Sequence, residues 1–136
     1  MRLSPASVLD ASALMAYLER ERGASVVAGH VKRGAVISTA NWAEVLAKLS
    51  DRGLAPDDFA RQLRSRGVLD KKLGLEPVDE AIALESARLR ASTSSRGLSV
   101  GDRICLATGL KLKLPVVTAD AIWEGLRIGI PIIVIR

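Results

Sequence analysis

Two aspartates follow short stretches that the sequence pattern predicts to be strands. Asp10 follows the apolar run Ser7-Val8-Leu9, and Asp120 comes shortly after the β-branched run Val116-Val117-Thr118. In an open α/β sheet, ligands and catalytic groups gather beyond the carboxyl ends of the strands, so both acids are expected at one rim. Carboxylates that converge at a rim provide the oxygen ligands that hard divalent cations prefer.

A third acid, Asp102, begins a helix whose buried stripe continues through Cys105, Leu106 and Gly109. Because this helix leads into the strand at 116–118, we expect Asp102 at the opposite rim, unless the irregular segment 92–101 carries it across. Its place on the stripe turns it inward. The pattern alone therefore leaves the position of Asp102 open.

Each of these acids also has a purely structural interpretation. Asp10 or Asp120 could cap a helix, and Asp102 could be the acid of a capping box that starts at Ser99. Ser12 and Ser99 are themselves good caps for the first and sixth predicted helices, which would leave Asp10 and Asp102 unnecessary in that role.

A fourth acid, Glu44, is not selected by periodicity. It lies roughly opposite the apolar stripe that Trp42, Val45 and Leu49 form on the same helix. A solvated helix face is its simplest explanation.

Short apolar strands alternate with helices along the chain. Such alternation is typical of a parallel sheet covered by helices on both faces. We therefore predict an α/β fold, a three-layer α/β/α sandwich with a short, mainly parallel central sheet, built as one domain over residues 1–136. The predicted strands are 7–10, 35–38, 75–78, 116–118 and 132–135. The predicted helices are 12–21, 24–32, 39–51, 56–66, 79–91, one that begins at Ser99 and a short one after Asp120, with a flexible loop at 92–97.

Composition narrows the class of protein. Hydrophobic residues make up 49% of the chain and aromatic residues only 3%, so the core is aliphatic. The apolar run 128–135 is far shorter than the roughly 18 residues of a membrane span, and Asp10 interrupts any signal-peptide core. We expect a cytoplasmic protein without membrane contact. The net charge of +5 favours an anionic partner, and the single cysteine, Cys105, is expected to be buried and inert.

Four blocks of sequence carry a resemblance to a known family. They are Val8-Leu9-Asp10-Ala11-Ser12-Ala13-Leu14, Asn41-Trp42-Ala43-Glu44-Val45, Leu98-Ser99-Val100-Gly101-Asp102-Arg103-Ile104-Cys105-Leu106-Ala107 and Val116-Val117-Thr118-Ala119-Asp120. In this order and spacing they resemble the PIN-domain ribonucleases, and in particular the VapC-like toxins of type II toxin–antitoxin pairs. The blocks are spread over essentially the whole chain, while residues 51–75 contribute no recognisable block to the resemblance.

The resemblance implies a site and an activity. Asp10, Glu44, Asp102 and Asp120 would form an acidic catalytic pocket, with hydroxyl support from Ser12 and Thr118. Asp10, Asp102 and Asp120 would be the main metal ligands, and Glu44 would act through water or position the attacking water. In the family, the helix of the third block delivers its acid to the same pocket as the others.

Four converging carboxylates repel one another without a counterion. Two unit charges about 5 Å apart at an effective dielectric near 20 interact by roughly 3 kcal/mol. Either some are protonated or a divalent cation lies among them. Oxygen ligands favour Mg²⁺ or Mn²⁺, and a zinc site is disfavoured because His30 and Cys105 are the only His and Cys of the chain.

Basic residues could hold the phosphates of an RNA substrate. Arg96 and Arg103, beside the third acidic block, are the candidates for RNA binding. A second basic segment is equally well explained as a solvated face; it comprises Arg61, Arg64, Arg66, Lys71 and Lys72. Trp42 and Trp123 are expected in the core or an interface, and His30 as a partly exposed residue at a helix end.

Three other classes of function are alternatives to a Mg²⁺- or Mn²⁺-dependent endoribonuclease. A phosphorylated receiver domain needs an acidic residue adjacent to Asp10, and none is present. A Ser-His-Asp hydrolase would depend on His30 and lacks a nucleophile elbow. The remaining alternative is a non-catalytic PIN-like module that binds RNA or protein. For partners, the resemblance implies RNA, a small cognate antitoxin that covers the acidic groove, and a homodimer.

Overall fold

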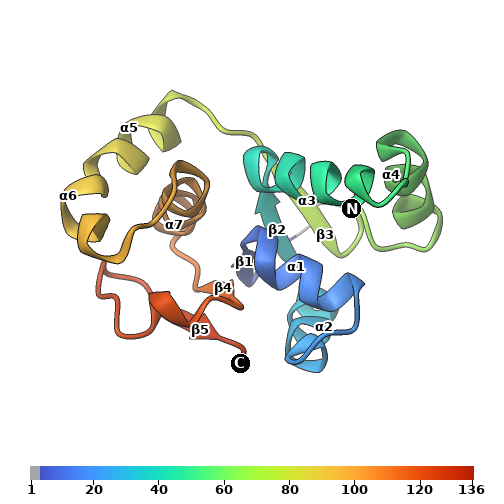
Figure 1. Cartoon of the computed structure of the whole chain (residues 1–136), viewed down its shortest axis with the longest axis horizontal. Helices are drawn as coiled ribbons and strands as arrows, with labels where there is room; N and C mark the ends of the chain where they lie inside the picture. The colour runs from blue at the N-terminus through green and yellow to red at the C-terminus, as the bar shows by residue number, and fades with distance from the viewer. Residues whose placement is uncertain (1–3) are drawn as a thin grey trace.

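A computed structural model of the chain describes residues 4–136. Five parallel strands form one sheet in the order β3-β2-β1-β4-β5 (Figure 1). The strands are β1 (Ser7–Leu9), β2 (Ala35–Ser38), β3 (Leu73–Glu76), β4 (Val116–Thr118) and β5 (Ile132–Val134). Their parallel arrangement confirms the predicted α/β sheet.

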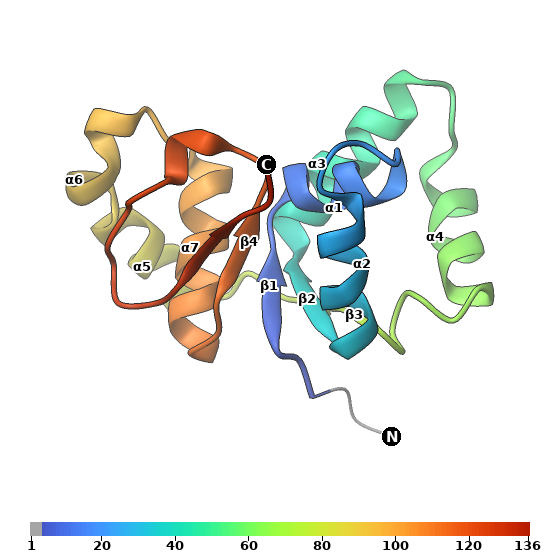
Figure 2. The same ribbon diagram turned by 90° about the horizontal axis from the view of Figure 1, so that it is seen from below.

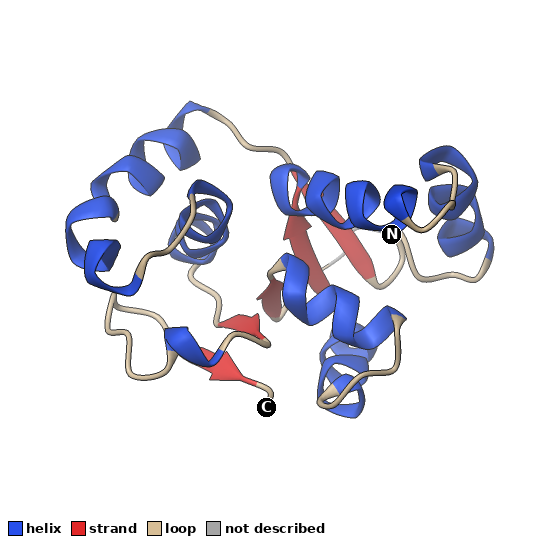
Figure 3. Ribbon diagram, in the orientation of Figure 1, coloured by secondary structure: helices blue, strands red, loops and turns tan. Residues whose placement is uncertain are grey.

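Helices occupy both faces of the sheet (Figure 3). The α-helices are α1 (Ala11–Leu18), α2 (Ala24–Arg33), α3 (Thr39–Asp51), α4 (Pro56–Ser65), α5 (Glu80–Arg88), α6 (Arg90–Thr93) and α7 (Val100–Leu112). Two short 3₁₀ helices are η1 (Ser94–Arg96) and η2 (Ala121–Trp123). Helices α5, α6 and α7 gather on one side of the sheet, and α1 to α4 lie on the other (Figure 1).

Each central strand contributes side chains to two separate hydrophobic cores, because successive side chains point to opposite faces of the sheet. Val8 packs with the cluster that contains Cys105, Leu106 and Trp123, whereas Leu9 packs with the cluster of α1 to α4. All the side chains of β1, β2 and β4 are buried. The predicted three-layer sandwich is therefore correct.

Strand β1 lies in the middle of the sheet, between β2 and β4 (Figure 2). Val8 is opposite Val36 on one side and Val116 on the other. The chain builds outward from β1 to β3 in one direction and from β4 to β5 in the other. The boundary between β1 and β4 is thus the topological switch point, where open parallel sheets form ligand crevices at their carboxyl ends.

The predicted third strand and the predicted loop at 92–97 are wrong. The third strand begins at Leu73 rather than Leu75, because pairing of Ala35 with Leu73 sets its register. The segment 92–97 is not a loop but contains the end of α6 and all of η1. Thr93 is buried, and its hydroxyl donates to the carbonyl of Leu89 at 2.7 Å, which holds this segment in helical turns.

No helix within residues 4–136 has the length and apolar character needed to cross a lipid bilayer. Trp42 and Trp123 are both buried, as the core interpretation predicts, and the Trp42 ring lies 6.1 Å from that of Phe59. In the basic segment, Arg61 pairs with Asp58 and Arg64 with Asp70 on the surface.

Candidate active site

A pocket at the carboxyl rim of the sheet brings together the four acids that the sequence singled out. Its volume is about 180 Å³. Its lining consists of Asp10, Ala11, Ser12, Asn41, Glu44, Lys48, Asp102 and Asp120. Residues that are more than a hundred positions apart in the sequence thus meet above the switch between β1 and β4.

Asp102 reaches this rim by a direct route, and the expectation that it starts at the opposite rim is wrong. Helix α7 precedes the parallel strand β4 and must run antiparallel to it, from the carboxyl rim back to the amino rim. The first turn of α7, which contains Asp102, therefore lies at the same rim as Asp120.

Asp10 is the most buried of the four acids, with 4% of its surface exposed. Its carboxylate accepts hydrogen bonds from the Ala13 backbone N–H at 2.7 Å, the Ser12 hydroxyl at 2.7 Å and the Thr118 hydroxyl at 2.6 Å. Burial raises the pKa of Asp10 from 3.8 to about 6, although these hydrogen bonds lower it; the charge of Asp102 adds to the rise. A buried carboxylate of this kind gains from a nearby cation.

Two hydroxyl groups join Asp10 to the end of β4. Thr118 donates to Asp10 and accepts from the backbone N–H of Asp120 at 3.0 Å. Ser12 donates to Asp10 and accepts from the Ala119 N–H at 2.9 Å. Each hydroxyl therefore ties the acid after β1 to the backbone that carries the acid after β4.

The structural roles weighed for the aspartates coexist with their places in the pocket. Asp10, not Ser12, is the N-cap of α1, because the helix starts at Ala11 and Ser12 lies inside its first turn. Ser99 caps α7 in a capping box in which Asp102 accepts from the Ser99 N–H at 3.0 Å. Asp120 caps the short η2 through the Ile122 N–H at 3.0 Å. A capping carboxylate keeps further lone pairs that can face the pocket.

Glu44 is exposed, as its position on α3 suggests, but it is held in a defined place. Its Oε1 accepts a hydrogen bond of 2.7 Å from Asn41 Nδ2. The same amide donates to the Gly101 carbonyl at 3.0 Å, so Asn41 links α3 to the first turn of α7. A Cβ placed on Gly101 would lie 2.5 Å from Glu44 Oε1, which shows how closely α7 approaches this carboxylate.

Asn41 and Lys48 are pocket residues that the sequence analysis did not single out. Asn41 is buried, and its Oδ1 accepts from the Ser38 hydroxyl at 2.7 Å. In the sequence, Asn41 lies three residues before Glu44 and Lys48 lies four residues after it, and both spacings place the residue on the same helix face as Glu44. These spacings indicate a pocket residue only once Glu44 itself is known to line the pocket.

The two predicted RNA-binding arginines do not line the pocket. Arg96 Nη1 donates to the carbonyls of Ile122 and Glu124 at 2.9 and 2.8 Å, so it holds the η2 turn. Arg103 Nη1 donates to the Leu98 carbonyl at 3.2 Å. These contacts give both side chains a structural role, and their contact with RNA stays a prediction.

Cys105 lies beneath the acids, fully buried. Burial raises the pKa of its thiol well above the usual value, and the charges of Asp10, Asp102 and Glu44 raise it further. The thiol is thus protonated, as expected for an inert buried cysteine. His30 is on α2, away from the pocket lining, where burial and Arg33 lower its pKa.

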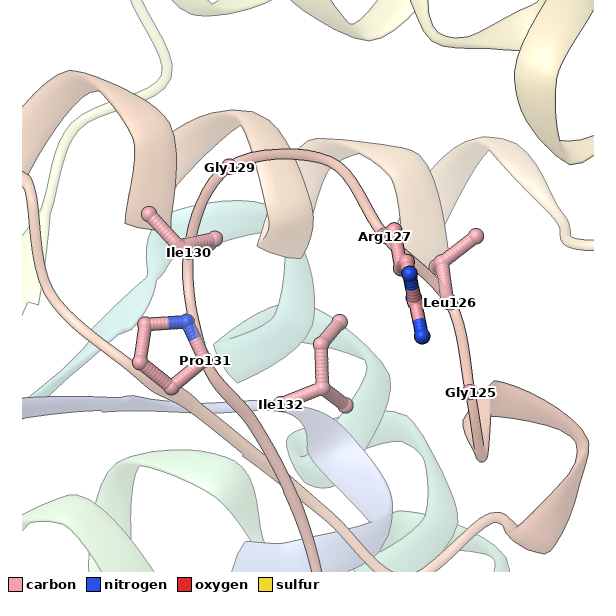
Figure 4. A pocket seen from close by; sticks show the side chains of 7 residues that line it. All are labelled: Gly125, Leu126, Arg127, Gly129, Ile130, Pro131 and Ile132. Carbon is pink, nitrogen blue, oxygen red and sulfur yellow. The ribbon is translucent and has the colours of Figure 1, made fainter.

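Two larger hollows elsewhere contain no carboxylate. One, of about 450 Å³, is lined by Gly125, Leu126, Arg127, Gly129, Ile130, Pro131 and Ile132 (Figure 4). The other, of about 420 Å³, lies among α1, α2 and α4 and is lined mainly by apolar and basic residues. Volume alone therefore does not distinguish the candidate site from these hollows; its four carboxylates do.

The donor set fits a hard divalent cation. The four acidic side chains that line the pocket offer only carboxylate oxygens, and neither His30 nor the buried Cys105 lines it. Within residues 4–136, no three acid, imidazole or thiol groups stand close enough to form a ready-made chelating cluster. Mg²⁺ usually keeps several waters and binds through one or two carboxylates, so a pocket of spaced carboxylates suits it.

The match to known proteins covers almost the whole chain. A family model described as PIN domain matches residues 7–128. The chain belongs to the PIN-domain family. PIN-domain proteins are nucleases.

Solved structures share this PIN fold at low sequence identity. A toxin–antitoxin complex from Klebsiella pneumoniae contains a chain 21% identical, with a TM-score of 0.65, covering 88% of this chain and 92% of that one. The DNA-bound VapBC of Salmonella typhimurium matches at 18% identity and TM-score 0.67, over 95% and 97%. VapBC2 of Rickettsia felis bound to a DNA fragment from its promoter matches at 12% identity and a TM-score of 0.68, covering 93% of this chain and 96% of that one. No curated protein matches by sequence.

Proposed function

We propose that this PIN domain is a Mg²⁺- or Mn²⁺-dependent endoribonuclease, the toxin of a toxin–antitoxin pair. The observation that carries the proposal is the convergence of Asp10, Glu44, Asp102 and Asp120 on one pocket at the switch between β1 and β4. The fold shared with chains of VapBC complexes supports the toxin assignment.

The carboxylates have distinct parts in this proposal. Asp10, Asp102 and Asp120 would hold the ion, which supplies an activated water and offsets charge on the leaving oxygen of a phosphodiester. Glu44, fixed by Asn41, would bind through water or orient the attacking water. Ser12 and Thr118 would keep the Asp10 carboxylate in place through the hydrogen bonds that they donate to it.

The direct test compares site variants with a surface control. Purified wild-type protein should cleave RNA in the presence of Mg²⁺ or Mn²⁺, and cleavage should stop when the metal is chelated. Asp102→Asn and Asp120→Asn should each lower the rate at least about a hundredfold, within the range expected for losing a catalytic group. Asp51→Asn, at the exposed end of α3, should cleave like the wild type.

A metal titration separates this function from a non-catalytic module. Mg²⁺ or Mn²⁺ should raise the melting temperature of the wild type, because a ligand that binds only the native state stabilises it. The Asp102→Asn variant should show a smaller rise. A protein that binds RNA but is neither stabilised by metal nor active would be a PIN-like binding module instead.

The partner assignment has its own test. An adjacent reading frame encoding a small DNA-binding protein should relieve growth arrest when expressed together with this chain, and should co-purify with it. The homodimer and the cytoplasmic location remain predictions, and light scattering of the purified chain tests the first of them.

A further inference from the structure

Lys48 is the single cationic side chain among the described residues that line the acid pocket. It is exposed and lies in the last turn of α3, one helical turn beyond Glu44. Residues four apart share a helix face, so Lys48 and Glu44 face the pocket together. Four carboxylates and one ammonium group thus surround the same space.

The ammonium group of Lys48 has no acidic partner in the described part of the chain. A Glu four residues before a Lys is the favourable order for a helical ion pair, and Glu44 stands in that place. The Glu44 carboxylate instead accepts from Asn41 and lies against Gly101, on the side of α7. The charge of Lys48 therefore remains available to a ligand of the pocket.

The positive charge of Lys48 disfavours binding of a metal ion in the pocket and favours binding of a phosphate group. A cation near the carboxylates repels a divalent metal ion and so lowers its affinity. The same cation attracts a phosphate group, and a Lys ammonium is a compact point charge suited to phosphate. A favourable interaction with the carboxyl end of α3 is a structural role for Lys48, but it does not depend on RNA or metal.

We propose that Lys48 is a substrate-binding residue, which contacts a backbone phosphate of the RNA as the strand crosses the acid pocket. The inference rests on the proposed ribonuclease function. A phosphate contact positions the strand and carries no base preference, so Lys48 contributes affinity rather than sequence choice.

The test compares Lys48→Gln and Lys48→Arg with Lys32→Gln, which removes an exposed lysine in the last turn of α2, outside the pocket. Lys48→Gln should raise KM for single-stranded RNA by about tenfold and leave kcat nearly unchanged, because the contact is equal in ground and transition states. The slope of log affinity against log salt should fall by about 0.7, as expected for one lost phosphate contact. Lys48→Arg should restore both values, and Lys32→Gln should change neither.

A second measurement needs no RNA. In a Mn²⁺ titration followed by melting temperature, Lys48→Gln should bind the ion several-fold more tightly than the wild type, since a repelling charge is gone. An effect limited to a helix end would leave Mn²⁺ affinity and KM unchanged, and that result would overturn the inference. A fall in kcat together with weaker Mn²⁺ binding would also overturn it.

The two proposals fail in different ways. If the wild type cleaves RNA with Mn²⁺ and Lys48→Gln has the same KM, only the role of Lys48 is wrong. If the wild type cleaves no RNA with any divalent metal, the ribonuclease function itself fails.

Discussion

Thr118 Oγ1 donates a 2.6 Å hydrogen bond to Asp10 Oδ2 and accepts one of 3.0 Å from the N–H of Asp120. One buried hydroxyl therefore sets the relative position of two of the four acids. Because Thr118 is the last residue of β4 and Asp10 follows β1, the bond spans the switch point of the sheet. The sheet topology and the geometry of the site are coupled through this residue.

Thr118→Val removes that hydroxyl while keeping the shape of the side chain. We expect a loss of about 1–3 kcal/mol in the free energy of unfolding, since the buried Asp10 carboxylate loses a partner. The pKa of Asp10 should rise above about 6, because this hydrogen bond lowers it. Denaturant unfolding and the pH dependence of Mg²⁺ binding measure the two effects.

Thr108→Val is the matched control. Thr108 is equally buried, but its hydroxyl donates to the Ile104 carbonyl inside α7, away from the pocket. It should alter stability without moving the pH dependence of metal binding. Equal shifts in both variants would contradict the role given to Thr118.

The buried Asp10 should make the metal-free protein more stable in mild acid. Its pKa rises from 3.8 in the unfolded chain to about 6 in the fold, so the native state binds more protons in this window. Stability from this group should fall as the pH rises from about 4 to about 6, by about 3 kcal/mol at 1.36 kcal/mol per pH unit.

Unfolding by urea across this pH range, with and without Mg²⁺, measures the effect. Mg²⁺ should recover stability above pH 6, where it competes with no proton on Asp10. Asp10→Asn should remove the part of the pH dependence of the unfolding free energy that Asp10 contributes. A wild-type curve no steeper than that of Asp10→Asn would show that burial does not perturb Asp10.

Gly101→Ala should damage the site and spare the fold. The new Cβ would lie 2.5 Å from Glu44 Oε1, and this flexible side chain can swing away, breaking its bond to Asn41. Ala also suits a helix better than Gly by up to about 1 kcal/mol, so the melting temperature should hold or rise. The RNA cleavage rate should fall.

Gly109→Ala is the same change two turns later on α7. There the Cβ would meet Val116 Cγ2 at 2.5 Å and Ile130 Cδ1 at 2.7 Å, inside the core. This variant should lose stability, with cleavage by the folded fraction kept. The opposite pattern in the two variants would refute the placement of Glu44.

Asn41→Asp tests whether Asn41 acts through Glu44. The change removes the amide donor that Glu44 and the Gly101 carbonyl share, and places a second negative charge beside Glu44. We expect a lower kcat and, in combination with Glu44→Gln, little further loss. Additive losses in this double-mutant cycle would mean that Asn41 has a separate function.

Arg96→Ala distinguishes RNA binding from support of the η2 turn. Trp42→Phe leaves Trp123, fully buried in η2, as the single tryptophan. If Arg96 holds this turn, its loss should shift Trp123 fluorescence to the red and lower kcat through Asp120. A raised KM with unchanged fluorescence would instead support the predicted RNA contact.

Local pattern was enough to place most elements and two of the acids. Short continuous apolar runs predict β1, β2 and β4, since a strand buried on both faces is apolar throughout. Asp10 follows β1 directly and Asp120 comes two residues after the end of β4, so their rim could be predicted from the topology of any parallel sheet. The resemblance to PIN domains then supplied Asp102 and Glu44.

Elements whose bounds depend on a distant neighbour were harder to predict. The register of β3 is set by β2, and the turns at 90–96 are held by the contact of Arg96 with η2. The N-cap of α1 is Asp10 rather than Ser12, because the helix begins directly at the end of β1.

By itself, then, the sequence determined an aliphatic, parallel α/β chain with acids at its strand ends, because such features depend on neighbours in sequence. Only the tertiary structure decided that Asp102 shares their rim, that Asn41 and Gly101 hold Glu44, and that Lys48 faces the pocket without an acidic partner among the described residues. Each of these relationships depends on how separate elements lie against one another. Packing of α3 and α7 at the switch point creates them, and no local pattern encodes that packing.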